Sequence, residues 1–366
     1  MRHTVHVMAT LAPPPVRRLL DAATALTTPL LPDDYLAYVN PLWSRREPRG
    51  IVDAVVPETR DAATIWLRTP QGWPAHTPGQ YVRVGVDVDG VRQWRTYSLT
   101  SLPGRRDRRI AITVKAVPGG AVSQELVHRT ARGTVVRLAP PVGDFVLPDP
   151  VPRRLCFVTA GSGVTPVTGM LRHLDAGGSI DAVHVHLAPS AGDSIGAAER
   201  HRLAARHPGY VLHEHHDDRD GRFGARRLAA LVADLGERET WACGPAGLLD
   251  ALTEHFAALG RPAALHLERF QPVVAAAGAE GEGGTVTFTA SGRKTEADGA
   301  TPLLVAGEEA GALLPSGCRM GICHSCVGRL TAGAVRDLRT GERYQAEDQM
   351  VRTCVSAAAG PVEIDL

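Results

Sequence analysis

The chain has 366 residues, of which 44% are hydrophobic and 22% charged, so two or three domains with buried cores are expected. The 40 Lys and Arg residues nearly balance the 39 Asp and Glu residues, giving a net charge of +1. This balance argues against general nucleic-acid binding, which needs a basic excess. No apolar run reaches the roughly 18 residues of a membrane span and no signal peptide is recognised, so a cytoplasmic protein is expected.

Residues 1–45 form an N-terminal arm that is more apolar than a free tail. Val16 to Leu26 has an apolar and basic pattern that predicts one short helix. Tyr35, Tyr38 and Trp43 follow among several prolines, which predicts an irregular segment. We expect these side chains to pack against the body of the protein. The second hypothesis is that the arm docks reversibly at the inner face of a membrane.

Residues 46–148 have the pattern of an antiparallel β domain. Short β-branched or alternating runs are separated by Gly, Pro and Asp, as in a sandwich or barrel. The predicted strands are Ile51 to Val56, Thr64 to Arg68, Gln80 to Val88, Arg95 to Thr100, Ile110 to Val117 and Thr134 to Leu138.

Residues 149–270 alternate between strand-like and helical runs, which predicts a doubly wound parallel sheet. The predicted strands are Arg154 to Thr159, Ala182 to Leu187, Tyr210 to His213, Glu239 to Cys243 and Ala264 to Leu267. The predicted helices are Val167 to Leu174, Ala198 to Ala205, Arg226 to Leu235 and Ala246 to Leu259.

Residues 271–284 are rich in Ala, Gly and Glu, which favours a flexible linker. Residues 285–366 then form a small α+β unit. Its predicted elements are a hairpin of Thr285 to Thr289 with Lys294 to Glu296, a helix from Thr301 to Ala312 and a last strand from Val362 to Leu366.

Four of the six cysteines lie in this last unit, at Cys318, Cys323, Cys326 and Cys354. Their spacing is the C-x4-C-x2-C…C pattern of a plant-type [2Fe–2S] cluster. Glycines in the loop allow its backbone N–H groups to approach the sulfides. A zinc site is the alternative, but such sites usually pair their cysteines in two short clips. Disulfides are not expected in a cytosolic chain.

Arg95 and Tyr97 share one face of a predicted strand, because side chains alternate along strands. This arrangement suits a phosphate and a flat heterocycle. Gly119 and Gly120 precede a helical stretch, where backbone N–H groups can hold a pyrophosphate. Considered singly, a surface ion pair for Arg95 and a barrel-filling ring for Tyr97 are the ordinary alternatives.

The parallel domain begins with a strand, a Gly-rich turn from Gly161 and a helix. The turn departs from the dinucleotide fingerprint, because Pro166 stands where the third glycine is usual. Cys243 ends another strand, at the sheet edge where ligands bind. The alternative for Cys243 is a small buried filler, which is the role expected of Cys156.

Histidines offer a weaker signal. The spacing within His213 to His216 suits no structural zinc site. His184 and His186 alternate with valines, so we expect them to line one face of a strand rather than bind a ligand.

Five motifs occur in one order along the chain: Arg-x-Tyr-Ser at 95–98, Gly-Gly-x-x-Ser at 119–123, Gly-x-Gly-x-x-Pro at 161–166, Cys-Gly-Pro at 243–245 and His-x-Glu-x-Phe at 266–270. This set resembles the ferredoxin–NADP reductase superfamily over about residues 46–366. With the cysteine loop, the chain resembles the reductase components of oxygenases and desaturases. The arm resembles that of the actinobacterial reductases that serve membrane acyl desaturases.

The resemblance implies a role for each motif residue. On the flavin side, Arg95 would pair with the phosphate, Tyr97 would lie against the isoalloxazine and Ser98 would reach the reactive ring nitrogen. The pyrophosphate would be held by Gly119, Gly120 and Ser123.

On the nicotinamide side, the residues implied to line the dinucleotide are Thr159, Gly161, Gly163 and Pro166. Cys243 would approach the nicotinamide ring, and Glu268 and Phe270 would close the flavin side. The implied catalytic residues are therefore Cys243, Glu268 and Ser98, and the implied metal ligands are Cys318, Cys323, Cys326 and Cys354.

The resulting expectation is a multidomain protein: an antiparallel β-barrel that binds FAD, an α/β doubly wound NAD(P) domain and an α+β ferredoxin domain of the β-grasp type. A monomer would pass electrons from NAD(P)H through FAD and the [2Fe–2S] cluster to a separate oxygenase or membrane acyl desaturase. The alternatives are an FMN-type dioxygenase reductase and, in a different class, an iron–sulfur redox sensor.

For the electron donor, the sequence slightly favours NADH. A 2′-phosphate usually needs an Arg near the end of the second parallel strand. None is adjacent to Ser190, although Ser190 itself, Arg200 or Arg202 could serve.

Overall fold

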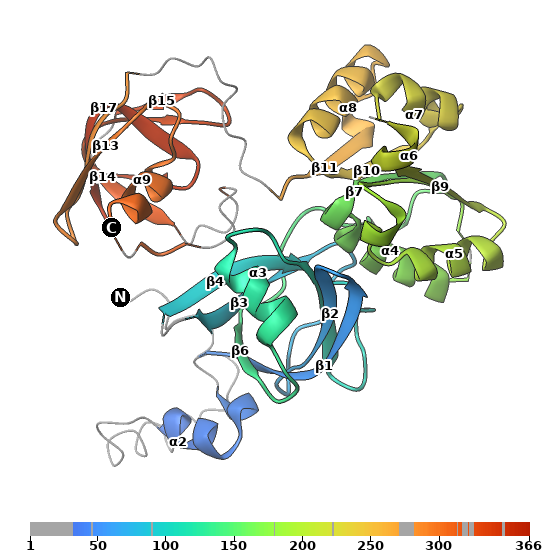
Figure 1. Ribbon diagram of the computed structural model, residues 1–366, viewed down its shortest axis with the longest axis horizontal. Coiled ribbons are helices and arrows are strands. Elements are labelled where there is room, and N and C mark those ends of the chain that lie inside the picture. Colours follow the sequence, from blue (N-terminus) through green and yellow to red (C-terminus); the bar gives the residue numbers. More distant parts are fainter. Residues whose placement is uncertain are drawn as a thin grey trace.

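The computed structural model describes residues 32–44, 47–88, 91–178, 180–221, 223–270, 282–312, 314–316, 321, 326–345 and 348–366. The predicted helix at 16–26, most of the predicted linker, Cys318 and Cys323 lie outside the described residues. Three sheets form three modules, with the barrel below the parallel-sheet module and the ferredoxin-like module beside them (Figure 1).

The first module is a six-stranded antiparallel barrel with the strand order β4-β3-β6-β1-β2-β5. Its strands are β1 (Arg49–Thr59), β2 (Ala62–Arg68), β3 (Tyr81–Val88), β4 (Val91–Ser98), β5 (Arg109–Lys115) and β6 (Val135–Leu138). A bridge between Leu99 and Ile112 joins the two outer strands and closes the sheet. Helix α3 (Ala121–Gln124) runs into a π-helical turn (Glu125–Arg129) and sends Val122 and Leu126 into the barrel core.

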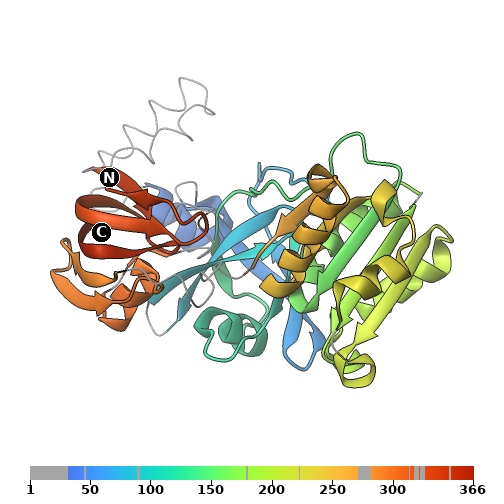
Figure 2. The same ribbon diagram turned by 90° about the horizontal axis from the view of Figure 1, so that it is seen from above.

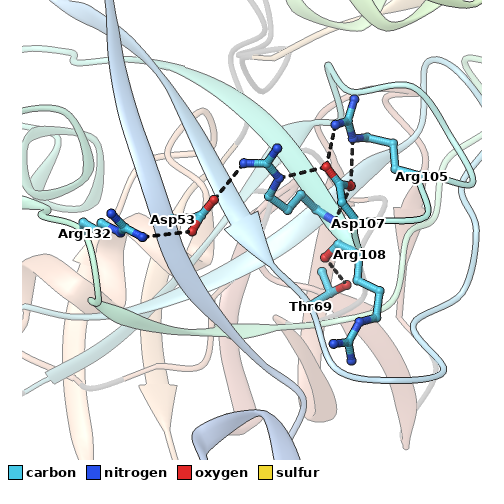
Figure 3. Close-up of polar contacts among 7 residues, drawn as sticks. Asp53, Thr69, Arg105, Asp107, Arg108 and Arg132 are labelled. Carbon is cyan, nitrogen blue, oxygen red and sulfur yellow. Dashed lines mark hydrogen bonds and ion pairs between the residues drawn. The ribbon is translucent and has the colours of Figure 1, made fainter.

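A polar network closes the end of the barrel where β5 begins (Figure 3). Arg109 donates to Asp53 at 2.8 Å and to Asp107 at 2.9 Å, and Arg105 binds Asp107 through two nitrogens. Both guanidinium groups lie over the Trp66 ring, at 5.1 and 5.5 Å from its centroid. These ion pairs are exposed or only half-buried, so each contributes little to the stability of the fold.

The second module is a parallel sheet with the order β11-β10-β7-β8-β9. Its strands are β7 (Leu155–Ala160), β8 (Ala182–Ala188), β9 (Tyr210–His216), β10 (Glu239–Cys243) and β11 (Leu265–Glu268). Helices α4 (Val164–Ala176) and α5 (Ala197–Arg206) lie on the face toward the barrel, with α7 (Ala225–Leu231) and α8 (Ala246–Ala258) on the other and the short α6 (Asp217–Asp220) after β9 (Figure 1). The strand order reverses at β7, which places a ligand-binding crevice beside its carboxyl end.

The third module is a mixed sheet with the order β13-β12-β17-β14-β15, to which β16 adds beside β14. Its strands are β12 (Gly284–Phe288), β13 (Arg293–Ala297), β14 (Val327–Asp337), β15 (Arg343–Tyr344), β16 (Gln349–Arg352) and β17 (Ser356–Asp365). Helix α9 (Leu303–Glu309) packs Leu303 against Phe288 and Val335. The three-module architecture expected from the sequence is therefore confirmed, and Figure 2 shows it from above.

The arm differs from expectation in the residues that are described. A helix α2 (Pro32–Val39) replaces the expected irregular segment, because proline is favoured in the first helical turn, where its missing N–H costs nothing. Tyr35 and Tyr38 are 49% and 83% exposed, and Ala37 is the one buried residue among those of this helix whose burial is described. Tyr38 therefore does not pack on the body as expected, and Tyr35 is half-exposed.

In the third module, the sequence did not predict β14, and the last strand begins earlier than expected. Gly328 and Gly333 interrupt the apolar alternation of β14, and the pairing with β17 shifts register beside Gly333. The bulge hides the strand from a pattern of period two. Among the described helices, none is long and apolar enough to cross a membrane.

Candidate functional site

A cavity of about 230 Å³ lies between the barrel and the parallel-sheet module. Both modules contribute to its wall. The predicted residues that line it are Arg95, Tyr97, Ser98, Gly120, Ser123, Glu268 and Phe270. Residues as far apart in the sequence as Arg95 and Phe270 therefore meet in one pocket, and the order of the motifs along the chain corresponds to one site in space.

Strand β4 supplies the barrel wall of this pocket. Arg95 donates from Nη1 to the Trp94 carbonyl at 2.8 Å, which holds the guanidinium along the strand. Burial raises the pKa of the Tyr97 phenol well above its ordinary value, so the ring stays neutral. Ser98 is 3% exposed, and its Oγ has no hydrogen-bond partner among the described atoms.

A tight glycine loop adjoins this wall at the start of α3. Gly119 has φ +72°, and a Cβ on Gly120 would lie 2.5 Å from the Val117 side chain and 2.6 Å from Ser123 Oγ. Ser123 Oγ donates to the Gly120 carbonyl at 3.0 Å. The loop thereby presents the first N–H groups of α3, which lack intrahelical acceptors, to the pocket. This is the environment that an anionic phosphate requires.

The parallel-sheet module closes the opposite side with the turn between β7 and α4. Gly161 has φ +53°, and a Cβ on Gly163 would lie 2.1 Å from the Cys243 carbonyl oxygen, so only glycine fits there. Pro166 is buried in the first turn of α4, where the missing N–H is tolerated.

Sequence reasoning missed two hydroxyls in this turn, Ser162 and Thr165, which also line the pocket. They occupy the variable positions of the Gly-x-Gly-x-x-Pro motif. Hydroxyl side chains at the variable positions of this motif were therefore the signal in the sequence that could have identified Ser162 and Thr165.

Thr159 does not line the pocket. Its side chain is fully buried and hydrogen-bonds with His184 Nε2 and His186 Nδ1, both at 2.8 Å. Tyr210 extends the network through its hydroxyl to His184 Nδ1 at 2.7 Å. Because this side chain is already engaged, Thr159 can contact a dinucleotide only through its backbone. The two histidines line one face of the sheet, as expected.

Cys243 and Glu268 are neighbours across strands β10 and β11. Burial, with the nearby Glu268, raises the pKa of the Cys243 thiol well above its ordinary value, so the sulfur keeps its proton. Burial raises the pKa of Glu268 to about 8, so this carboxyl is mostly protonated at neutral pH. Cys243 is fully buried behind the turn and does not itself line the pocket, while Cys156 is a buried filler as expected.

The pocket fits a polar, flat ligand. Glu268 Oε2 and Ser98 Oγ are buried without partners, one on each side of the same cavity. Buried polar atoms without partners are costly and call for a ligand or water. A flavin ring has hydrogen-bonding edges and a large apolar face, and the glycine loop suits its phosphates.

The described part of the cysteine site contains Cys326 and Cys354, which are 1% and 2% exposed and pack with Leu304 and Val355. Thr353 links them, since its N–H and Oγ1 donate to the Cys326 carbonyl at 3.1 and 2.8 Å. Within the described residues, no group of three or more His, Cys, Asp or Glu side chains could hold a metal ion. Two of the four predicted ligands lie outside those residues.

Gly321, between the first two predicted ligands, has φ +74°. Arg352 donates to its carbonyl at 2.8 Å, which ties the cysteine loop to the strand before Cys354. Buried thiols and a backbone curled by glycine fit an iron–sulfur cluster.

Comparison with known proteins gives two family matches. Residues 55–147 match a model described as an oxidoreductase FAD-binding domain, and residues 286–359 match a 2Fe-2S iron-sulfur cluster binding domain. The two matches coincide with the barrel and with the third module.

Individual relatives extend the match over nearly the whole chain. An NADPH oxidoreductase of Mycobacterium tuberculosis is 50% identical over 94% of this chain and 91% of its own length. The glycine betaine monooxygenase reductase subunit of Pseudomonas aeruginosa is 30% identical over 85% of this chain and 93% of its own. The solved structure of phthalate dioxygenase reductase has a TM-score of 0.61 at 23% identity, covering 87% of this chain and 98% of that one.

The raised pKa of Glu268 predicts a pH-dependent stability that the Glu268→Gln substitution removes. A carboxyl whose pKa is higher in the folded than in the unfolded state stabilises the fold at low pH, and this contribution is lost as the pH rises toward about 8. Relative to wild type, Glu268→Gln should gain on the order of 10 °C in melting temperature between pH 5 and pH 9, because about three pH units of linkage correspond to about 4 kcal/mol. Thermal unfolding of both proteins, with Glu254→Gln as an exposed control on α8, measures this; a constant difference would contradict it.

Proposed function

Because the chain belongs to the ferredoxin–NADP reductase superfamily, as a flavin and [2Fe–2S] reductase with a C-terminal ferredoxin domain, we propose that it passes electrons from NAD(P)H to a separate acyl desaturase or oxygenase. The main support is the pocket in which Ser98 and Glu268 leave buried polar atoms unpartnered, one from each module. We also propose the domain boundaries: residues 46–148 bind FAD, residues 149–270 bind NAD(P) and residues 285–366 hold the cluster.

Bound FAD supplies the conversion of a two-electron hydride transfer into single-electron steps. The residues of the chain prepare the site. Ser98 offers its hydroxyl and Glu268 a protonated carboxyl, while the neutral Tyr97 ring provides an apolar face. Cys243 keeps its proton, so beside the nicotinamide it would provide a packing surface and the dipole of its S–H bond rather than a charge. Ser98 and Glu268 are 3% and 8% exposed, and hydrogen bonds of buried groups are stronger than those in water.

The proposed electron acceptor is an oxygenase or a membrane acyl desaturase. The name of the Pseudomonas aeruginosa relative supports an oxygenase, and the arm motifs favour a membrane acyl desaturase. We place the protein in the cytoplasm as a monomer that visits the inner face of the membrane. The exposed Tyr38 and Trp43, 83% and 51% accessible, are aromatic side chains of the kind found at membrane surfaces.

The two alternatives receive less support. An FMN enzyme fits the match to an FAD-binding domain less well. An iron–sulfur sensor would not need a flavin pocket with a nicotinamide turn on its opposite wall.

The holoprotein should contain one FAD and two irons per chain and reduce cytochrome c with NAD(P)H. Each of Cys318→Ser, Cys323→Ser, Cys326→Ser and Cys354→Ser should lose the iron and cytochrome c reduction while retaining FAD. Cys156→Ser should keep both, and Cys243→Ser should keep the iron but slow flavin reduction. Chromatography of acid-released flavin, iron analysis and stopped-flow absorbance measure these outcomes; zinc in place of iron, or FMN alone, would refute the assignment.

For the donor, we retain NADH, and two observations support it. Ser190 donates to Asp193 at 2.7 Å, and Arg60 lies 3.5 Å from the same carboxylate, so this cation near the end of β8 is already paired. Arg200 is 2% exposed and binds Glu214 at 2.8 Å, so it is not available to a 2′-phosphate. The name of the Mycobacterium tuberculosis relative favours NADPH instead. We expect a higher kcat/KM for NADH, and a higher value for NADPH would overturn this choice.

Deleting residues 1–40 tests the docking role of the arm. If the arm docks the protein beside a membrane-bound acceptor, NAD(P)H-driven dye reduction and melting temperature should persist while acceptor-coupled activity falls. Binding of the full chain to vesicles with anionic lipid should weaken with salt. Full acceptor-coupled activity of the truncated protein would exclude docking.

A further inference from the structure

Helix α4 connects the two sides of the pocket. It begins directly after the Gly161–Gly163 turn, on the nicotinamide side. It also lies on the barrel-facing side of the parallel sheet (Figure 1), where it meets the chain segment that follows Ser98. This segment, Leu99 and Thr100, leaves the end of β4 immediately beside the flavin pocket.

The backbones of α4 and the barrel approach at two glycines. A Cβ on Gly169 would lie 2.5 Å from the Leu99 carbonyl oxygen. A Cβ on Gly79, in the barrel, would lie 2.6 Å from the methyl carbon of Met170 on α4. The Leu99 carbonyl leaves no space for a side chain at Gly169, so the approach of α4 to the barrel requires glycine there. Gly79 requires glycine for another reason, because its φ is +100° and a Cβ would lie 2.1 Å from the Phe145 carbonyl oxygen.

Arg172, one turn further along α4, adds a hydrogen bond to the contact between α4 and the barrel. It donates from Nη1 to the Thr100 carbonyl at 2.6 Å. Its Nε and Nη2 bind Glu199 of α5 at 2.7 and 2.6 Å. This bidentate pair orients the guanidinium, and the charge-assisted bond to the barrel is stronger than a neutral one.

The barrel side of the contact is equally constrained. The N–H of Leu99 donates to Gln80 and the N–H of Thr100 donates to Ala111, both at 2.8 Å. Because both residues are tied to their neighbouring barrel segments, α4 docks onto a rigid surface. A buried group formed by Val164, Ala62 and Ile195 makes a second contact beside the first turn of α4.

We propose that Gly169 and Arg172 are positioning residues, which set the distance between a nicotinamide bound at the Gly161–Pro166 turn and a flavin bound beside Ser98. The inference rests on the proposed function. The step concerned breaks the C4–H bond of the reduced nicotinamide and transfers its hydrogen nucleus with two electrons to the flavin ring nitrogen. The nicotinamide is oxidised and the flavin reduced. An error of about 1 Å in such a distance costs up to about a hundredfold in rate.

The test compares Arg172→Ala, Arg172→Lys and Gly169→Ala in the holoenzyme. Arg206→Ala is the matched control, because Arg206 also joins α5 to α4, through Asp175 at 2.5 Å, but has no bond to the barrel. Anaerobic stopped-flow absorbance at saturating donor gives the limiting rate of flavin reduction, the apparent dissociation constant and the charge-transfer band between nicotinamide and flavin. FAD content and melting temperature are measured alongside.

Arg172→Ala and Gly169→Ala should reduce the limiting rate about tenfold and weaken the charge-transfer band. FAD content should be unchanged, and the dissociation constant should change by less than about twofold. Arg172→Lys should recover part of the rate, and Arg206→Ala should match wild type. Gly169→Ala changes the spacing without removing a hydrogen bond, and its melting temperature shows how far the clash with the Leu99 carbonyl outweighs the higher helix propensity of alanine.

A wild-type rate and charge-transfer band in both Arg172→Ala and Gly169→Ala would overturn the inference. A rate that falls only in proportion to lost FAD would also overturn it, since the role would then be structural. If Arg172→Ala does not fold, Gly169→Ala decides alone. If the wild-type flavin is reduced by neither NADH nor NADPH, the proposed function fails, which is a separate result.

Discussion

The close approach of backbone to backbone at glycine is the constraint on which this site depends. Gly163 lies against the Cys243 carbonyl within the parallel-sheet module, and Gly169 lies against the Leu99 carbonyl of the barrel. Both contacts bring together segments far apart in the chain, and the second joins the two modules. A side chain at Gly169 would push the two walls of the pocket apart. Electron transfer between two bound cofactors depends on that separation.

Burial determines the charge state of the pocket. The pKa of Glu268 rises to about 8 because the carboxyl is removed from water with no cation beside it. Burial also holds the phenol of Tyr97 protonated despite the nearby Arg95, and it holds the thiol of Cys243, behind the pocket, protonated as well. The pocket therefore contains hydrogen-bond donors rather than anions at neutral pH. Donors of this kind suit a ligand whose ring atoms gain negative charge on reduction.

The polar groups inside the parallel-sheet module have a different purpose. Thr159, His184, His186 and Tyr210 hydrogen-bond with one another beneath the nicotinamide turn. Burial lowers the pKa of both histidines well below the ordinary value, so they are neutral. This network orders the carboxyl ends of neighbouring strands without placing a charge near the pocket. It shows how a residue in a recognised motif can serve the fold rather than the ligand.

The sequence by itself determined the modules and most of the site, because those signals are local. Strand alternation, the spacing of the cysteines and the Gly-rich turns depend on neighbours within a few positions, and motif order linked them to one family. Tertiary structure alone decided that the Thr159 hydroxyl is hydrogen-bonded to two histidines. It also decided that Tyr38 is exposed and that the Glu268 carboxyl keeps its proton. It also decided that Arg172 reaches the barrel. Burial and contacts between distant segments depend on how the modules pack, and no local pattern encodes that packing.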